Sequence, residues 1–326
     1  MAPMPLASSS SKLCSLLILC LAFLAAVDRS TAGIFDEIEL IWGASRTYFF
    51  MDGDSEALAL SLDQSQGSCF RSREKYLYVQ IDVEIKLIEG DSAGTVCTIY
   101  TISEGPWEIH DEIDLEFLGN VTGEPYTLHT NIFANGVGGR EQQFRLWFDP
   151  TADYHTYSIV WNPKRILILV DGKAIRDFKN NEDQGVPFPT WQSMRTFGSL
   201  WSAEDWATQG GRVKTDWKQA PFVTYYRNYN VTWCRPSPGV AWCGDEPKDS
   251  TRFDLDANTL SDLQWVRSNS MIYNYCDDSV RFNATTLPKE LSLTCYLSRL
   301  LMCFCTVSFS LSLFNKQTIL MWPTLK

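Results

Sequence analysis

The sequence is poor in histidine and in positive charge, and both shortages exclude classes of protein. Only three of its 326 residues are histidine, at positions 110, 129 and 155, and no Cys/His partner lies at metal-ligand spacing, which argues against a zinc enzyme. Lys and Arg number 28 against 39 Asp and Glu, giving a net charge of −11. Binding to nucleic acid needs a clustered positive surface, so that partner is not expected. Internal repeats are not evident.

The N-terminus has an apolar run that is too short for a membrane-spanning helix. Residues 13–27 form a run of fifteen after Lys12, whereas a spanning helix needs ~20. Small residues at positions 30–32 then offer a cleavage site before Gly33. This pattern predicts a secretory signal peptide over residues 1–32 and an extracellular mature protein.

Secretion makes the cysteines candidates for disulfides. Eight of the ten cysteines lie beyond the predicted signal. Cys234 and Cys243 bracket a Pro/Gly-rich loop, and their close spacing favours a disulfide between them. Asn-x-Ser/Thr acceptors at Asn120, Asn230 and Asn283 fit the same compartment.

Residues 33–229 show short alternating segments separated by turn signals. Residues 57–62, 78–87, 156–161 and 165–170 each read as a strand, and the last ends in an Asp-Gly turn. Helical periodicity does not intervene between them. The pattern predicts an all-β protein, with an antiparallel β-sandwich as the main domain.

The alternating strand pattern ends at about residue 229. Residues 230–292 read as a disulfide-stapled C-terminal extension, with one short helix predicted over residues 261–275. Residues 293–326 form an atypical tail that contains an apolar run from 300 to 314. This run is short for a membrane span, and a poorly ordered tail is the prediction.

One predicted strand carries acids where strands normally avoid them. Glu112, Asp114 and Glu116 alternate with three large apolar residues. Because side chains repeat every two residues, all three acids share one face while the apolar residues enter the core. Their mutual repulsion raises at least one pKa, and a local violation of this kind is typical of a functional site.

Glycoside cleavage is the chemistry that uses such an arrangement. One carboxylate attacks the anomeric carbon and a second, kept protonated, delivers a proton to the leaving oxygen. Three other interpretations stay open on the pattern alone: a solvated acidic face, a calcium site and a zinc site using His110. The loop spacing of known calcium sites is missing, and so are further zinc ligands.

The segment 110–120, HDEIDLEFLGN, resembles the signature of plant xyloglucan endotransglucosylase/hydrolases of glycoside hydrolase family 16. Similarity extends from about residue 35 to about residue 290. The further segments that carry it are 128–131, 139–142, 146–150, 199–201, 205–211, 214–217, 220–222 and 271–276.

This resemblance implies a fold, an activity and residue roles. The fold would be a concanavalin-like β-jelly roll with a small C-terminal extension. Glu112 would be the nucleophile, Glu116 the acid/base and Asp114 the auxiliary residue, with a glycan on Asn120. The segments expected to line the substrate cleft supply His129, Thr130, Asn131, Gly139, Arg140, Glu141, Trp201, Asp205, Trp206, Gly210 and, in the extension, Arg281.

The sequence departs from the family pattern in four places. Trp107, Glu108 and Ile109 look like a short insertion before the acidic strand. Cys69 stands where glycine is expected, and Ser202 where asparagine is usual. The family partner of Cys276 is missing, and Cys295 is the nearest substitute.

The expected activity is therefore cleavage of the β-1,4-glucan backbone of xyloglucan with retention, followed by transfer to another xyloglucan chain. A xyloglucan or mixed-linkage β-glucan hydrolase and a non-catalytic, lectin-like glucan-binding protein are the alternatives. A monomer in the cell wall and apoplast is expected. A two-carboxylate mechanism requires no metal and no cofactor.

Overall fold

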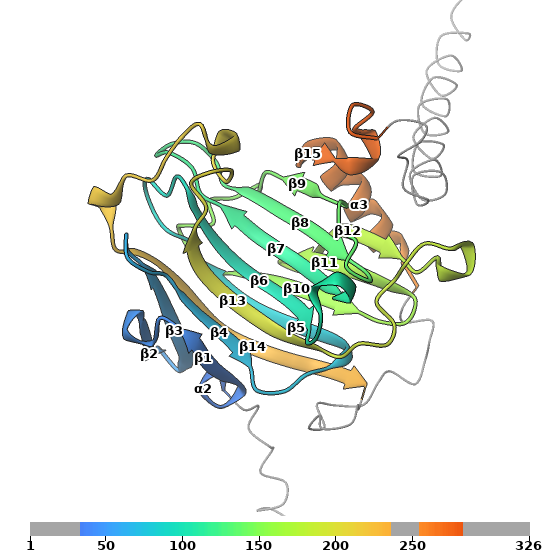
Figure 1. The fold of residues 1–326 in the computed structure, drawn as a ribbon, viewed down its shortest axis with the longest axis horizontal. Coiled ribbons are helices and arrows are strands. Elements are labelled where there is room, and N and C mark those ends of the chain that lie inside the picture. Colours follow the sequence, from blue (N-terminus) through green and yellow to red (C-terminus); the bar gives the residue numbers. More distant parts are fainter. Residues whose placement is uncertain (1–32, 236–253, 283–326) are drawn as a thin grey trace, which may run out of the picture.

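The computed structural model describes residues 33–235 and 254–282, which form two antiparallel sheets packed face to face (Figure 1). The eight-stranded sheet has the order β1 (Ile38–Trp42), β4 (Ser68–Ser72), β13 (Met194–Ser202), β6 (Thr95–Ser103), β7 (Glu112–Leu118), β8 (Thr127–Phe133), β9 (Gln142–Phe144) and β15 (Met271–Asn274). The seven-stranded sheet has the order β12 (Lys173–Lys179), β11 (Arg165–Val170), β10 (His155–Trp161), β5 (Leu77–Lys86), β14 (Phe222–Arg235), β3 (Ser55–Leu62) and β2 (Thr47–Asp52).

Helices are few in the described chain. They are α2 (Ile34–Glu37), α3 (Ala257–Asn269) and short 3₁₀ turns at Ala44–Arg46, Trp107–Ile109, Glu182–Gln184, Gln209–Gly211, Trp217–Gln219 and Tyr275–Asp277. Among the described residues, none of these helices has the length and apolar character to cross a membrane. The prediction of an all-β sandwich with one short C-terminal helix is confirmed.

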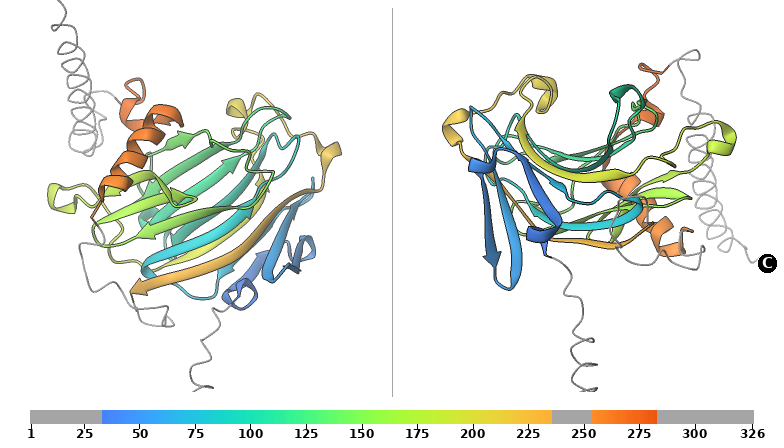
Figure 2. Two further views of the ribbon diagram at one scale, coloured as in Figure 1. Left: turned by 180° about the vertical axis from the view of Figure 1, so that it is seen from behind. Right: turned by 60° about the horizontal axis from the view of Figure 1, so that its bottom comes forward.

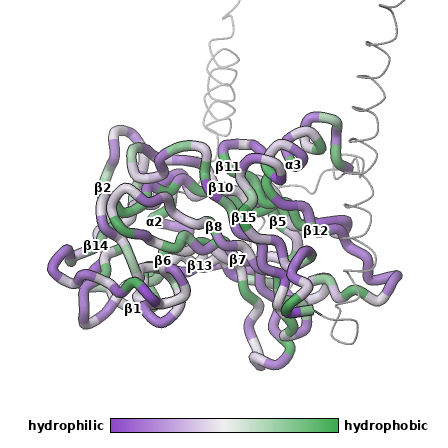
Figure 3. Tube along the Cα trace, turned by 90° about the horizontal axis from the view of Figure 1, so that it is seen from above, coloured by the Kyte–Doolittle hydropathy of each residue, from purple (hydrophilic) through white to green (hydrophobic). Residues whose placement is uncertain are grey.

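The core lies between the two sheets and follows from the alternation seen in the sequence. On β7, Ile113, Leu115 and Phe117 are fully buried, and the Phe117 ring meets the Tyr157 ring of β10 edge-on at 4.6 Å. Trp161, also on β10, is fully buried and donates its Nε1–H to the Pro189 carbonyl at 3.0 Å. Hydrophilic residues predominate in the loops around these layers (Figure 3). Burial of one face of β7 therefore fixes which face its acids must occupy.

The predicted strands agree with the observed ones to within two residues, because each has a clear alternation. The helix differs. α3 begins after Asp256, whose side chain accepts from the Thr259 N–H at 2.7 Å and caps the first turn. It ends at Asn269, and Met271–Asn274 forms strand β15 instead of the predicted continuation. The prediction of a helix over 261–275 is correct for residues 261–269 and wrong for residues 270–275.

The extension is joined to the sandwich. β15 pairs with the edge strand β9, and α3 lies along β12, where Lys173 contacts Asp262 at 2.7 Å (Figures 1 and 2). The boundary predicted between residues 229 and 230 falls inside β14. The predicted signal, Cys243, Cys295, Asn283 and the tail lie outside the described residues.

Candidate active site

The three acids of β7 share the face of the eight-stranded sheet that points away from the core. The register on either side places Tyr100 of β6 and Asn131 of β8 opposite Asp114. Glu112 and Glu116 are partly exposed, with side-chain exposures of 12% and 23%, whereas Asp114 is 8% exposed. The acids therefore form one row in which the middle member is the most enclosed.

A groove of about 410 Å³ crosses the strands above this row. Six neighbouring strands contribute to it, which gives it the elongated course that suits an extended polymer. Its lining residues are Trp42, Cys69, Thr98, Tyr100, Glu112, Asp114, Glu116, Asn131, Phe133, Ser199 and Trp201.

A larger hollow of about 620 Å³ lies on the outer face of the other sheet, over β2, β3 and β14. Its lining contains one carboxylate, Asp63, and this is bound by Arg46 at 2.7 Å. A paired acid without a second carboxyl cannot divide the roles of nucleophile and proton donor. The groove over β7 is therefore the candidate active site.

Glu116 is suited to be a proton donor. Burial, together with the negative charge of Glu112, raises the pKa of Glu116 to about 7. His129 lies beside it, with its Nε2 atom 3.9 Å from Glu116 Oε2. Burial lowers the pKa of His129 to about 4, and its Nδ1 accepts from the Gln143 amide at 2.9 Å. This histidine is neutral near pH 6, and the acid keeps its proton there.

Asp114 is held protonated between its neighbours. Burial, followed by the charges of Glu112 and Glu116, raises the pKa of Asp114 well above its ordinary value. The two carboxyls of Asp114 and Glu112 are hydrogen-bonded. Because Asp114 carries the proton, it donates to Glu112 and stabilises the ionised form of that residue.

Glu112 is the carboxyl best placed to be ionised. Burial raises its pKa, but hydrogen bonds from Asp114 and His110 oppose the rise. The Nε2 atom of His110 lies 3.1 Å from Glu112 Oε2. The environments of the row thus distinguish Glu112, whose ionised form is stabilised by hydrogen bonds, from Glu116, which keeps a proton near pH 6. Glycoside cleavage needs two carboxyls that differ in this way.

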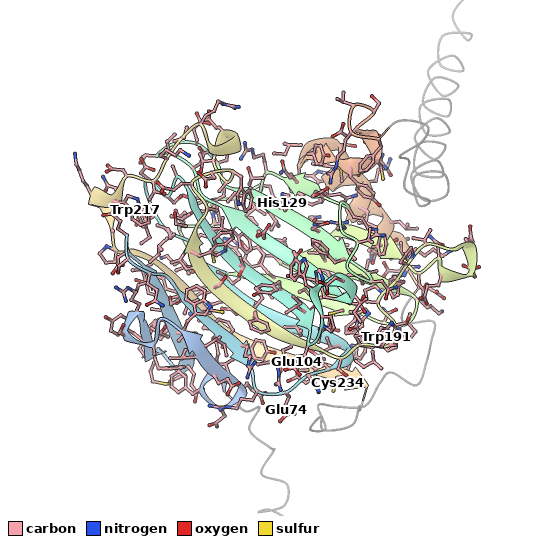
Figure 4. All side chains as sticks on the ribbon, viewed as in Figure 1. Glu74, Glu104, His129, Trp191, Trp217 and Cys234 are labelled. Carbon is pink, nitrogen blue, oxygen red and sulfur yellow. The ribbon has the colours of Figure 1, made fainter. Side chains whose placement is uncertain are left out.

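The predicted aromatic residues lie at the groove and beside His129. Trp201 lines the groove, and its ring lies 6.2 Å from that of Trp206. The ring centroids of Trp206 and His129 are 6.3 Å apart. Figure 4 shows His129 on the open face of the sheet. Asn131 lines the groove, and its Oδ1 accepts from two backbone N–H groups.

Thr130 and Arg140 point away from the groove, in contrast to their predicted place in its lining. Thr130 has no exposed surface, since its neighbours His129 and Asn131 take the open face of β8. Arg140 is 3% exposed, and its guanidinium donates to the carbonyls of Ile132 and Val137. Both residues support the sheet from inside.

Glu141 and Arg281 connect the main domain to the extension. Their side chains form a two-pronged ion pair, with N···O distances of 2.6 and 3.2 Å. Burial raises the pKa of Glu141, but the hydrogen bonds and charge of Arg281, together with a backbone hydrogen bond, outweigh burial, and the net pKa is lowered. Gly139 lies under this pair with φ of 81°, and a Cβ there would come 3.2 Å from Arg281 Nη2.

The remaining predicted residues lie further out. Asp205 is fully exposed and 3.4 Å from Lys214, and Gly210 adopts φ of 67° in the same loop. Asn120 is half-buried just after β7, with its Nδ2 donating to the Pro125 carbonyl. Cys234 and Cys276 are both disulfide-bonded.

Several lining residues were missed because only strand register brings them to the groove. Tyr100 and Phe133 face the acids from β6 and β8, and Trp42 reaches the groove from β1. Cys69 also lines it, and burial raises the pKa of its thiol to about 12. Beneath the site, buried Arg176 donates to Thr130 Oγ1 at 2.7 Å. The sequence offered one signal for Arg176, namely a charged residue at an inward-facing position of strand β12.

Within the described chain, no group of three or more His, Cys, Asp and Glu side chains is arranged to hold a metal ion. The chemistry described above is carried by carboxyl groups.

The raised pKa of Glu116 makes stability depend on pH. Between its ordinary value of 4.5 and about 7, the folded protein holds a proton that the unfolded chain has released. The free energy of unfolding should therefore fall as pH rises, by roughly 2–3 kcal/mol across that interval. Urea unfolding at pH 4.5 and 7.5 measures this contribution, which Glu116→Gln should abolish. The exposed Glu89 provides a control, since Glu89→Gln should behave as wild type; an unchanged pH dependence in Glu116→Gln would contradict the assignment.

Comparison with known proteins identifies the family of the chain. A model described as "Glycosyl hydrolases family 16" matches residues 35–219, and one described as "Xyloglucan endo-transglycosylase (XET) C-terminus" matches residues 241–290. "Xyloglucan endotransglucosylase protein 7" of Diospyros kaki is 51% identical over 80% of this chain and 96% of its own. "Xyloglucan endotransglucosylase/hydrolase protein 15" of Arabidopsis thaliana is 52% identical over 77% and 87%, respectively.

Among solved structures, the Bacillus licheniformis β-glucanase matches with a TM-score of 0.46 and 23% identity, over 60% of this chain and 92% of that one. The resemblance seen in the sequence is confirmed by the two family models and by the curated relatives. The chain belongs to glycosyl hydrolase family 16 and carries the C-terminal extension of the xyloglucan endo-transglycosylases.

Proposed function

We propose that the protein cuts xyloglucan chains and rejoins them to other xyloglucan chains. The observation that carries this proposal is the row of three carboxyls held in different protonation states at the base of a groove that crosses six strands. The names of the curated relatives supply the polymer.

In the first step, an oxygen of Glu112 attacks the anomeric carbon of the bound glucan. The glycosidic bond breaks, and Glu116 gives its proton to the departing oxygen. The result is a covalent ester between Glu112 and the sugar, with Glu116 left as a carboxylate. Asp114 stays protonated throughout and orients Glu112.

In the second step, the hydroxyl of an acceptor sugar gives its proton to Glu116 and attacks the same carbon. The ester bond breaks and Glu112 is released, so the product keeps the original configuration. Water can take the place of the sugar. A well-held acceptor, with an effective molarity of ~10⁵–10⁸ M, prevails over water.

The Glu141–Arg281 pair lies where the extension meets the open face of β8 and β9, and we place the acceptor there. Arg281 keeps the extension against the main domain while presenting polar groups to the sugar hydroxyls. This placement predicts that the extension acts on transfer more than on bond cleavage.

We also propose that the protein is secreted into the cell wall and apoplast, acts as a monomer and carries a glycan on Asn120. The sequon Asn-Val-Thr and the position of Asn120 at the surface end of β7 support the glycan. A disulfide between Cys234 and Cys243, and one from Cys276 to Cys295, remain proposals whose second partners lie outside the described residues.

Incubation with xyloglucan and labelled xyloglucan oligosaccharides tests the proposed function. Transfer should place label in the polymer with few new reducing ends, and Glu112→Ala should abolish both signals. Glu116→Gln should lower the rate ~10²–10⁴-fold, as loss of a general acid does. New reducing ends without label would indicate a hydrolase instead. Binding without either product would indicate a lectin-like protein.

The acceptor site has its own test. Arg281→Ala should raise the KM for the acceptor oligosaccharide several-fold while leaving hydrolytic cleavage of the donor near wild type. Its effect on stability should be within ~1 kcal/mol, because the pair is partly exposed. Arg46→Ala is a matched control, since it breaks an arginine–carboxylate pair on the other sheet. Equal acceptor KM values in the two variants would refute the placement.

A further inference from the structure

His110 is enclosed on both faces and bound at both nitrogens. Its ring is 2% exposed and stacks on the Trp107 ring, with centroids 4.0 Å apart and planes inclined by 17°. The Phe133 ring covers it from β8 at 4.9 Å. One orientation of the imidazole is therefore fixed, and it directs Nε2 at Glu112.

The hydrogen-bond partners of His110 determine how many protons the His110–Glu112 pair holds. Nδ1 lies 2.6 Å from the Trp107 carbonyl oxygen, which only accepts, so Nδ1 must carry a hydrogen. In a neutral imidazole Nε2 would then have a lone pair, facing an oxygen of Glu112 at 3.1 Å. That contact is attractive only if Nε2 or the carboxyl is protonated.

The His110–Glu112 pair thus holds one proton more than a neutral imidazole and a carboxylate together. Attack on the sugar needs Glu112 ionised, so the reactive form has that proton on His110. We propose that His110 is an imidazolium that positions and charges the nucleophile, and that Trp107 is the positioning residue that maintains it. This inference rests on the function proposed above.

The segment that looks like an insertion supplies the groups that hold His110 in place. Trp107–Ile109 forms a 3₁₀ turn before β7, giving both the stacking ring and the carbonyl. The turn is held in place at two points. Gln192 donates to the Ile109 carbonyl at 2.8 Å, and Gly136, whose N–H binds the His110 carbonyl, has no room for a Cβ against the Glu108 carbonyl.

The charges around His110 favour its protonated form. Glu112 lies at Nε2, the buried Asp111 is adjacent in sequence, and the exposed Glu108 lies on the same turn as Trp107. All three are acidic, while β8 faces the ring with the uncharged Phe133. The face of an indole also attracts a cation, so the Trp107 stack favours imidazolium over imidazole.

A fixed imidazolium acts on both halves of the reaction. When Glu112 forms its bond to the sugar, the Nε2–H stays on His110 and donates to the ester oxygen. When the acceptor hydroxyl attacks, that ester bond breaks and its electron pair returns to Glu112. The imidazolium of His110 then stabilises the negative charge that develops on the carboxylate. No proton leaves His110 in either step, and Glu116 alone exchanges one with the sugars.

Nitrogen-15 NMR of histidine-labelled protein tests the proposal directly, because the chain has three histidines. Without substrate at pH 6, His110 should show both nitrogens protonated. In Trp107→Ala this signal should be weaker at pH 6 than in wild type, and Trp107→Phe should restore most of it. Glu112→Gln should remove it at pH 6. His155, on the other sheet, is the internal reference.

Kinetics give a second readout. Trp107→Ala should lower kcat for transfer about two- to fivefold with little change in KM. A neutral His110 in the wild-type protein at pH 6 would overturn the proposal. A raised KM with an unchanged His110 signal would also overturn it, showing Trp107 as a sugar contact alone. Since the spectra are taken on free protein, they can fail while the transfer assay succeeds, and the reverse.

Discussion

Repulsion among three carboxyls on one strand face is the constraint on which the site depends. Neighbouring members of the row are two residues apart, or about 6.6 Å along the strand. Two charges at that distance repel by about 2.5 kcal/mol in an effective dielectric of about 20, equivalent to nearly two pKa units. Ionisation of all three is therefore disfavoured, most strongly for Asp114, which has an acidic neighbour on either side. Asp114, the most enclosed member, keeps its proton and stabilises the ionised form of Glu112, whereas the pKa of Glu116 is raised to about 7.

Packing of β7 in the sandwich offsets the repulsion among its three acids. The other face of β7 buries three large apolar side chains, which fix the strand and its register whatever the acids cost. Hydrogen bonds then select the ionised residue, because Asp114 donates to Glu112 and the proposed imidazolium of His110 would donate to it as well. The extension is attached to the same sheet through β15 and the Glu141–Arg281 pair, so the acidic row and the proposed acceptor site share one frame.

Local patterns in the sequence predicted what alternation determines: the strands and the acidic face of β7. The roles of Glu112 and Glu116 came from the family resemblance and stay a proposal. Contacts between strands could not be predicted this way. Tyr100 and Phe133 reach the groove through register alone, and Thr130 faces inward because its neighbours face out. Arg140 was expected in the groove because its segment resembles one that lines it, yet its guanidinium turns to backbone carbonyls. The helix end was missed because pairing with β9 draws Met271–Asn274 into a strand.

The protonation of the carboxyl row can be measured directly by infrared difference spectroscopy of the protonated carboxyl band, in wild type and in Asp114→Asn. One band should persist well above the pH range in which a free aspartic acid titrates, and it should be lost in Asp114→Asn. A second band should titrate near pH 7 and be lost in Glu116→Gln. If all protonated carboxyl signal in the wild-type protein were already lost when the pH had risen to 5, the proposed protonation of the row would be contradicted.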